Sequence, residues 1–288
     1  MGTFSNISVS TLGATFNRRG DKIMVELTQK DIEFFKTEGY LVKRNVLDPG
    51  LMERARARLW DGAPEGRKRE DPETWIGPFT PEEENVDKNN NRRGFRWNFR
   101  EPGGEEWMVQ LLATDPNVWG MAEQLLGEGN LVQPDRVRGI YCTLPYGDVP
   151  KKSIGCHVDA HPFHLGAVGY IDDVPPEGGG FTVWPGSHQV FYYDYHSQYK
   201  NEPTPQYDVD RERISRGPGI ECCGNAGDIV FWHHRIGHAA GHNYSQQIRQ
   251  AVLYDFRKTE LAHTQEEPPN EDMWRDWPGI KALENGSA

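Results

Sequence analysis

The chain has 288 residues, and its 12 Phe, 11 Tyr and 9 Trp are too many for a disordered protein. Its 43 acidic residues outnumber its 32 Lys and Arg, and the net charge of −11 would repel a nucleic-acid backbone. No apolar run reaches the roughly 20 residues that span a bilayer, and the four cysteines show neither metal-site spacing nor the density of a disulfide framework. We therefore expect a soluble, cytoplasmic protein, monomeric or homodimeric, with no nucleic-acid or membrane partner.

The first part of the chain is predicted to be helical, after a loose N-terminal arm at residues 1–22. Three helix starts carry a capping residue: Thr28, with Asp31 three positions later as in a capping box; Asp48 before Pro49; and Asp115 before Pro116. The segment "GYLVKRNVL" reads as a strand between the first two helices. We expect this helical part to extend over 28–127.

Residues 62–95 are charged, rich in Asn and Pro, and without a period, which predicts a long loop. From residue 128 the sequence pattern changes to short segments rich in β-branched and aromatic residues: "LVQPDRVRGIYCTL", "LGAVGYI", "GFTVWPGS", "GDIVFW" and "IRQAVLYDF". These predict a β core over 128–262. A single domain is therefore expected at 23–262, followed by a polar C-terminal tail at 263–288.

A connection of about thirty residues, 189–219, separates two of these predicted strands. It is dense in tyrosine and charge and has no clear period, and structureless connections of this length are usually functional or disordered. We interpret it as a lid over the site, with a surface insertion as the alternative.

The segment "GCHVDAHPFH", residues 155–164, contains three of the ten histidines. His157, His161 and His164 have helical spacing, but Pro162 would break a helix there. In an extended chain His157 and Asp159 point to the same side. They would then supply two of the three ligands of the 2-His-1-carboxylate triad that binds non-heme Fe(II). The alternative is an H-x-D that arises by chance in a surface or structural segment.

A third ligand would have to come from the histidine-rich segment that follows "GDIVFW". It offers His233, His234, His238 and His242. Three of these would align on a helix, but Gly237 and Gly241 disfavour a helix, and a strand, a turn and a second strand are predicted instead. The residues alone leave the choice open.

Four motifs in order resemble the phytanoyl-CoA dioxygenase family of Fe(II)- and 2-oxoglutarate-dependent oxygenases. They are H-x-D, "GGGFTVWPGSH", "GDIVFW", and a histidine followed by N-x-S and an arginine, and the resemblance covers roughly 28–260. It implies a mainly β fold with flanking helices, built on a double-stranded β-helix (jelly-roll, cupin-like) core.

The resemblance also selects residues. In that family the distal iron histidine lies eleven positions before the arginine that pairs with the far carboxylate of 2-oxoglutarate, and His238 and Arg249 have this spacing (249 − 238 = 11). It therefore implies that His157, Asp159 and His238 bind Fe(II) and that Arg249 binds 2-oxoglutarate, as the planar fork of an arginine suits a carboxylate.

Four further residues are weaker candidates. Tyr170 lies near the position where the family places an aromatic residue beside 2-oxoglutarate, and Thr143 could donate to the same carboxylate. A core tyrosine is the alternative for Tyr170. Trp184 and His161 could contact the substrate, with core packing and solvent exposure as their respective alternatives.

The resemblance thus implies an oxidoreductase: a dioxygenase that uses Fe(II), 2-oxoglutarate and O2, releases succinate and CO2, and oxidises an unactivated C–H bond of a small molecule, with hydroxylation as the default outcome. Two alternatives remain. A zinc hydrolase would use the same three ligands but has no need of Arg249. A jelly-roll binding module without catalysis would explain the strands but not the ligands.

Overall fold

Two antiparallel sheets form the centre of the protein, and the computed structural model describes residues 25–284, so the expected arm at 1–22 lies outside the described residues. The larger sheet has the strand order β1 (Tyr40–Lys43), β8 (Ile229–His233), β5 (Leu165–Tyr170), β10 (Arg249–Phe256), β4 (Ile140–Thr143), β3 (Arg96–Phe99) and β2 (Asn90–Arg93). The smaller sheet has the order β7 (Ile220–Cys222), β6 (Phe181–Val183) and β9 (His238–Ala240).

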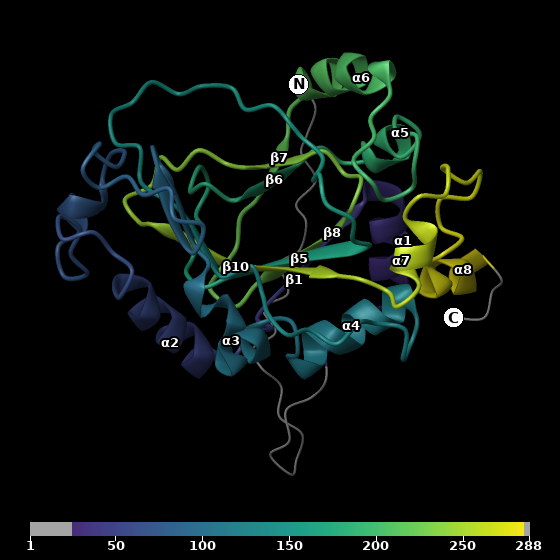
Figure 1. The fold of residues 1–288 in the computed structure, drawn as a ribbon, viewed down its shortest axis with the longest axis horizontal. Helices are drawn as coiled ribbons and strands as arrows, with labels where there is room; N and C mark the ends of the chain where they lie inside the picture. The colour runs from purple at the N-terminus through teal and green to yellow at the C-terminus, as the bar shows by residue number, and fades with distance from the viewer. Residues whose placement is uncertain (1–24, 285–288) are drawn as a thin grey trace, which may run out of the picture.

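Helices cover one face of the larger sheet, and the smaller sheet covers the other (Figure 1). The covering helices are α1 (Gln29–Glu38), α2 (Pro49–Trp60), α3 (Glu106–Leu111) and α4 (Pro116–Leu126). The strands of the larger sheet alternate between two cores: Ala167 and Phe231 pack against the helices, while Val168 and Trp232 face the smaller sheet. This period of two, with apolar residues on both faces, explains why the central strands read as continuous apolar runs.

The predicted helix starts are confirmed at all three positions. The Thr28 hydroxyl accepts a hydrogen bond from the backbone N–H of Asp31, and the Asp31 carboxylate accepts one from the backbone N–H of Thr28, which is the capping box. Asp48 and Asp115 cap α2 and α4 through side chains that accept from backbone N–H groups of the first turn, each before a proline at the first helical position.

The 3-10 helices η1 (Pro72–Trp75) and η2 (Glu101–Gly104) complete the first part of the chain, which also contains β1, β2 and β3. It is therefore less helical than expected. Residues 62–95 are largely loop, but their end forms β2, which pairs with β3.

The connection at 189–219 differs from the expected structureless segment. It contains most of α5 (His188–Phe191) and all of α6 (Pro205–Ser215), and Tyr192, Tyr195 and Tyr199 are buried. The segment was predicted to be structureless because it shows no periodic apolar pattern. Its buried tyrosines do not lie along one face of a helix, so they produce no such pattern.

The C-terminal segment, expected to be a polar tail, packs onto the domain. It contains α7 (Leu261–Thr264) and α8 (Pro278–Glu284), and Trp277 and Ile280 are fully buried in the core beside α1 and α4. A few large apolar residues spaced among many polar ones were enough to dock it.

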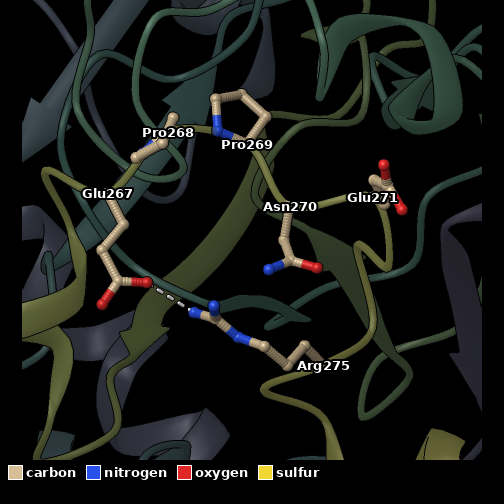
Figure 2. A pocket seen from close by; sticks show the side chains of 6 residues that line it. All are labelled: Glu267, Pro268, Pro269, Asn270, Glu271 and Arg275. Atoms are coloured by element: carbon tan, nitrogen blue, oxygen red, sulfur yellow. Dashed lines mark hydrogen bonds and ion pairs between the residues drawn. The ribbon is translucent and has the colours of Figure 1, made fainter.

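An open cleft of about 480 Å³ lies on this C-terminal segment (Figure 2). Its lining comprises Glu267, Pro268, Pro269, Asn270, Glu271 and Arg275, and Arg275 forms an ion pair of 2.6 Å with Glu267. It shares no residue with the histidine and aspartate group described next.

Candidate metal centre

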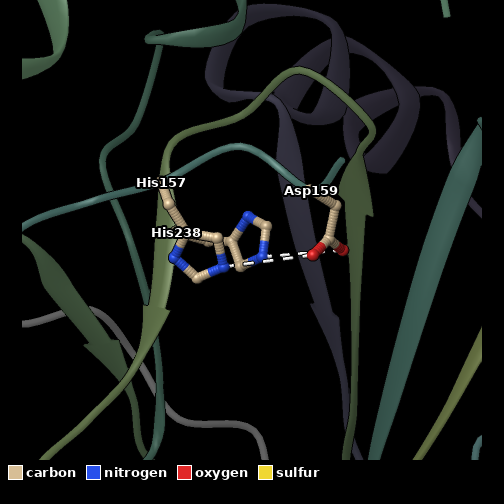
Figure 3. A group of neighbouring side chains, drawn as sticks. All are labelled: His157, Asp159 and His238. Carbon is tan, nitrogen blue, oxygen red and sulfur yellow. Dashed lines mark ion pairs between the residues drawn. The ribbon is translucent and has the colours of Figure 1, made fainter. Parts of the chain in front are cut away.

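His157, Asp159 and His238 come together at one end of the smaller sheet (Figure 3). One ligand atom from each lies within 4.8 Å of the other two. Asp159 Oδ1 is 3.9 Å from His157 Nε2, and Asp159 Oδ2 is 3.7 Å from His238 Nε2. The three residues that the sequence analysis selected therefore lie next to one another in the structure.

Backbone pairing holds the two imidazoles side by side. His238 lies on β9 opposite Val183 of β6, and His157 forms an isolated antiparallel bridge with His238. Each of the two histidines donates its backbone N–H to the carbonyl of the other, at 3.0 and 2.9 Å. The H-x-D segment thus extends the smaller sheet by one bridge, and its extended backbone turns His157 and Asp159 to the same side.

The protonation states of this group suit metal binding. Partial desolvation of the ring, followed by the electrostatic effect of His238, lowers the pKa of His157 to about 4, so its imidazole is neutral at pH 7 and can offer a lone pair. Burial would raise the pKa of Asp159, but the nearby His238 and the hydrogen-bonded guanidinium of Arg138 hold it below its usual range. The His157 side chain is 55% exposed, which leaves one side of the group open.

The donor set fits Fe(II). Two imidazole nitrogens and one carboxylate oxygen facing one point, with an open side, are the ligands that non-heme Fe(II) oxygenases use.

Arg249 lies in a second group, together with two residues from neighbouring strands. Arg249 on β10 pairs with Thr143 on β4, and Thr143 pairs with Arg96 on β3. Thr143 Oγ1 accepts hydrogen bonds from Arg96 Nη1 at 2.8 Å and from Arg249 Nη2 at 3.3 Å. The glycine-rich motif contributes as well: Gly179, at φ 80°, directs its carbonyl to Arg249 Nε at 2.9 Å, in a backbone conformation that favours glycine.

Arg249 is buried and Arg96 is partly buried, and within residues 25–284 neither forms an ion pair with a carboxylate. Burial lowers the pKa of Arg249, and burial together with the charge of Arg249 lowers the pKa of Arg96 to about 10. Buried charges without a counter-ion are costly. A bound carboxylate would offset part of this positive charge and accept hydrogen bonds from both guanidiniums, so the far end of 2-oxoglutarate fits here.

Tyr170 uses its hydroxyl elsewhere. It donates to the carbonyl of Cys222 at 2.5 Å and accepts from the backbone N–H of Phe181 at 3.0 Å, and it is completely buried. Its hydroxyl proton is used in the hydrogen bond to Cys222, which links β5 to the smaller sheet, so Tyr170 cannot donate to a bound carboxylate. This geometry favours the core role that was the alternative for Tyr170.

The two candidate substrate residues occupy different environments. Trp184 is buried in a small core with Cys156 and Val158, and it donates Nε1 to the carbonyl of Gly217 at 3.0 Å. His161 is half-exposed beside the carboxylate of Asp159 and hydrogen bonds to Asp255. The structure therefore supports packing for Trp184 and places His161 beside Asp159 and Asp255.

The other histidines of the second motif lie away from the three ligands. His233 and His234 are buried near Trp277 and Tyr199 respectively, and His242 packs against Tyr146. The eleven-residue spacing thus selected the histidine that meets His157 and Asp159.

Three residues at the site were missed from the sequence: Arg96, Arg138 and Asp255. Arg96 begins "RWNF", in which polar and apolar residues alternate, and this signal could have identified a strand with Arg96 on its polar face. Asp255 interrupts the apolar run "AVLYDF", and a charge within such a run marks a partner or a site.

Among residues 25–284 no helix is long and apolar enough to cross a membrane. The four cysteines are all free thiols.

Comparison with known proteins supports this organisation. The sequence model of the phytanoyl-CoA dioxygenase (PhyH) family matches residues 35–251. No curated protein sequence matches the chain.

Two solved structures illustrate the similarity in fold. One is the non-heme alpha-ketoglutarate-dependent carbocyclase SnoK from nogalamycin biosynthesis, with 19% identity and a TM-score of 0.53 over 86% of this chain and 95% of that one. Another is EctD from S. alaskensis with bound Fe, with 14% identity and a TM-score of 0.53 over 85% of this chain and 81% of that one. These similarities confirm the predicted jelly-roll fold with flanking helices.

Proposed function

Because this chain belongs to the phytanoyl-CoA dioxygenase family, we propose that His157, Asp159 and His238 are its Fe(II) ligands and that Arg249 and Arg96 bind the far carboxylate of 2-oxoglutarate. As a member of this family, the protein is an Fe(II)- and 2-oxoglutarate-dependent dioxygenase. One observation carries the residue assignment: the fold contains both a His–Asp–His group and two neighbouring arginines, Arg249 buried and Arg96 partly buried, that have no acidic partner among residues 25–284.

The chain's own residues have separable tasks. The two imidazoles and one carboxylate fix the metal and leave the side next to the half-exposed His157 open. Arg249, Arg96 and the Thr143 hydroxyl hold the cosubstrate by its far end and so set how its other end reaches the metal. Bound Fe(II) supplies the site at which O2 is activated as 2-oxoglutarate is converted to succinate and CO2.

We propose hydroxylation of a small molecule as the outcome. Asp159 supports this choice, because a carboxylate ligand leaves no ligand position for a halide that would be transferred in place of oxygen. The exposed side of the metal group admits a small molecule, and the acidic chain disfavours polyanionic polymers. Four free thiols support a reducing, cytoplasmic setting.

The segment 189–219 is proposed to be a lid within a single catalytic domain. Its helix α6 contacts the H-x-D segment directly: the backbone N–H of Cys156 donates to Ser215 Oγ at 3.0 Å, and that of Val158 donates to the Tyr207 hydroxyl at 3.2 Å. These two contacts support a role for α6 in covering the metal group and excluding water during turnover.

A cosubstrate assay tests this function without knowledge of the substrate. Metal-free protein is loaded with Fe(II) and given 2-oxoglutarate labelled at C1 in the presence of O2. We expect slow release of labelled CO2 that requires iron, is absent with Zn(II) and is lost in His238→Ala. Label release that is equal with and without iron would contradict the proposed function, and a Zn(II)-loaded protein that hydrolyses esters or amides would favour the zinc-hydrolase alternative.

A further inference from the structure

A second group of potential ligands adjoins the proposed iron site. Asp159, His161 and Asp255 also place one ligand atom each within 4.8 Å of the other two. Asp159 belongs to both groups. Taken by their ligand atoms alone, these residues could hold two cations that share the carboxylate of Asp159, as in sites with two metal ions.

The guanidinium of Arg138 lies among all three ligands of this second group. Arg138 Nη2 is 3.0 Å from Asp159 Oδ2, 2.7 Å from Asp255 Oδ1 and 2.9 Å from His161 Nε2. Arg138 Nε also donates to Asp255 Oδ2 at 2.7 Å. A side-chain cation therefore occupies the position that a second metal ion would need.

Arg138 is held there from two sides. Its backbone N–H donates to the carbonyl of Leu253 on β10, at 2.8 Å, and its side chain binds Asp255 two residues further along the same strand. The side chains of Arg138 and Asp255 are only 22% and 14% exposed. A charge-assisted pair with two parallel hydrogen bonds is directional as well as strong, so the guanidinium cannot turn away from Asp159 without losing its anchor.

We propose that Arg138 is a positioning residue that takes the place of a second metal ion, fixes the carboxylate of Asp159 and keeps the iron centre mononuclear. The inference rests on the proposed ligand role of Asp159. Because Arg138 binds Oδ2, the rotation of the carboxylate is fixed and Oδ1 stays directed to the His157 side. Partners behind a metal ligand orient it in this way, and their loss commonly changes metal binding by 10- to 100-fold.

Replacement of Arg138 by a neutral side chain should create a second cation site. Without the guanidinium, Asp159 and Asp255 are two carboxylates next to an imidazole, and divalent cations bind such oxygen and nitrogen donors. Metal-free protein is titrated with Mn(II), and free Mn(II) is counted by its electron paramagnetic resonance signal. We expect a single bound equivalent in the wild type and in Arg138→Lys, and a second equivalent in both Arg138→Met and Arg138→Gln.

Two controls define the site. Adding Asp255→Asn to either neutral variant should remove the second equivalent. Arg56→Met should bind one, because Arg56 pairs with Asp172 at 2.6 Å, with a similar exposure of 25%, and contacts none of the ligands. A single equivalent with wild-type affinity in both neutral variants, or two equivalents in the wild type, would overturn the proposal. A wild type that binds no Mn(II) would contradict the iron-site assignment itself, and the role of Arg138 would fall with it.

Discussion

At the residue scale, the proposed cosubstrate site is marked by two arginine guanidiniums whose positive charges a bound carboxylate would offset. Arg96 and Arg249 share the hydroxyl of Thr143 and have no carboxylate partner within the described chain, whereas Arg138, a few residues before Thr143, is fully paired with Asp255 and Asp159. The unpaired guanidiniums suit an exchangeable anion, and the paired one suits a permanent structural role. This contrast suggests different functions for Arg96 and Arg138, which the sequence alone does not distinguish.

Loss of either unpaired arginine should weaken cosubstrate binding selectively. Removing one partner of a buried, hydrogen-bonded charge pair costs about 2 kcal/mol or more, so Arg249→Met and Arg96→Met should each raise the Kd for 2-oxoglutarate by about 30-fold or more. Metal affinity should stay at the wild-type value, since neither side chain is a proposed ligand. Calorimetric titration of Ni(II)-loaded protein with 2-oxoglutarate measures the effect.

Arg100→Met is the matched control for these variants. Arg100 donates Nε to the hydroxyl of Tyr141 on β4, the strand that carries Thr143, at 2.7 Å. Its loss should leave the Kd for 2-oxoglutarate unchanged. If Arg96→Met behaved like Arg100→Met, Arg249 would be the sole anchor and the two-arginine site would be wrong.

The site residues that could be predicted are those whose spacing along the chain is itself the signal. H-x-D and the eleven residues from His238 to Arg249 are local patterns. Arg96, by contrast, reaches Thr143 only through the register of β3 against β4, and Arg138 reaches Asp159 only because β10 presents Asp255 beside it. Such register is fixed by the packing of the whole sheet, and no short segment encodes it.

At the element scale, α6 is held more weakly than the strands that it covers. Asp210 is its one buried residue, while Tyr207 and Ile214 are partly buried against the core around Trp184. Its hydrogen bonds to the H-x-D segment come from Ser215 and Tyr207. An element with few buried contacts opens at low free energy, which is what a lid requires.

Amide hydrogen exchange should therefore separate α6 from the sheet. We expect the amides of α6 to exchange much faster than those of β10, and Ser215→Ala to accelerate exchange in α6 and at Cys156 without affecting β10. Thr37→Ala, at an exposed position of α1, serves as the control. Protection of α6 equal to that of β10 would show that this helix is part of the rigid core, and the lid would have to be abandoned.

The predictions for single elements succeeded where the determinants are local. The caps at Thr28, Asp48 and Asp115 act within one helical turn, and each is present in the structure. The prediction for α6 failed because this helix has no apolar stripe, so the signal on which a sequence reading depends is missing. Of "LVQPDRVRGIYCTL", β4 takes up only Ile140–Thr143, since Pro134 cannot donate a ladder hydrogen bond.

At the scale of the whole molecule, a cluster of buried histidines joins α5, the end of β8 and the C-terminal segment. His164, His188, His233 and His234 are between 0% and 3% exposed, and His233 stacks on Trp277 with a centroid distance of 5.2 Å. Each has a ring nitrogen without a hydrogen-bond partner among the described residues. Burial lowers the pKa of His164 to about 3 and that of His188 to about 4, and it holds the pKa of His233 and His234 well below the usual range.

This cluster should make the protein unstable to mild acid. A histidine with a lowered pKa in the folded state binds its proton only on unfolding, so its stabilising effect is complete above the unfolded pKa of about 6.5 and is lost as the pH falls toward 3 or 4. Each such group contributes up to about 1.4 kcal/mol per pH unit in that window. Asp172 and Asp194, whose pKa burial raises, oppose the trend, but the four histidines of the cluster outnumber them, and the lowered pKa of His157 and of His242 acts in the same direction as the cluster.

Urea unfolding of the metal-free protein between pH 7.5 and 5 measures this dependence. The free energy of unfolding should fall steadily below pH 6.5, and His188→Gln should reduce the slope. His263→Gln, at an exposed position, should leave the slope unchanged. A free energy of unfolding that is constant over this range would contradict the burial of these four rings in the native state.

The fold class was predictable because the sequence pattern changes near residue 128, from segments that begin with helix-capping residues to short apolar segments typical of strands. The docking of the C-terminal segment was not, since it depends on Trp274, Trp277 and Ile280 finding the surface of α1 and α4 across more than 150 residues of chain. Long-range contacts of this kind carry no local periodicity.

The central claim is that His157, Asp159 and His238 hold the iron to which 2-oxoglutarate binds, with its far end on Arg249 and Arg96. Anaerobic addition of Fe(II) and then 2-oxoglutarate, followed by visible absorption spectroscopy, tests it most directly. We predict a metal-to-ligand charge-transfer band in the wild type and in His242→Ala, no band in His157→Ala or His238→Ala, and a band in Arg249→Met only at much higher 2-oxoglutarate. A wild type that binds iron but shows no band, or a full band in His238→Ala, would contradict the account.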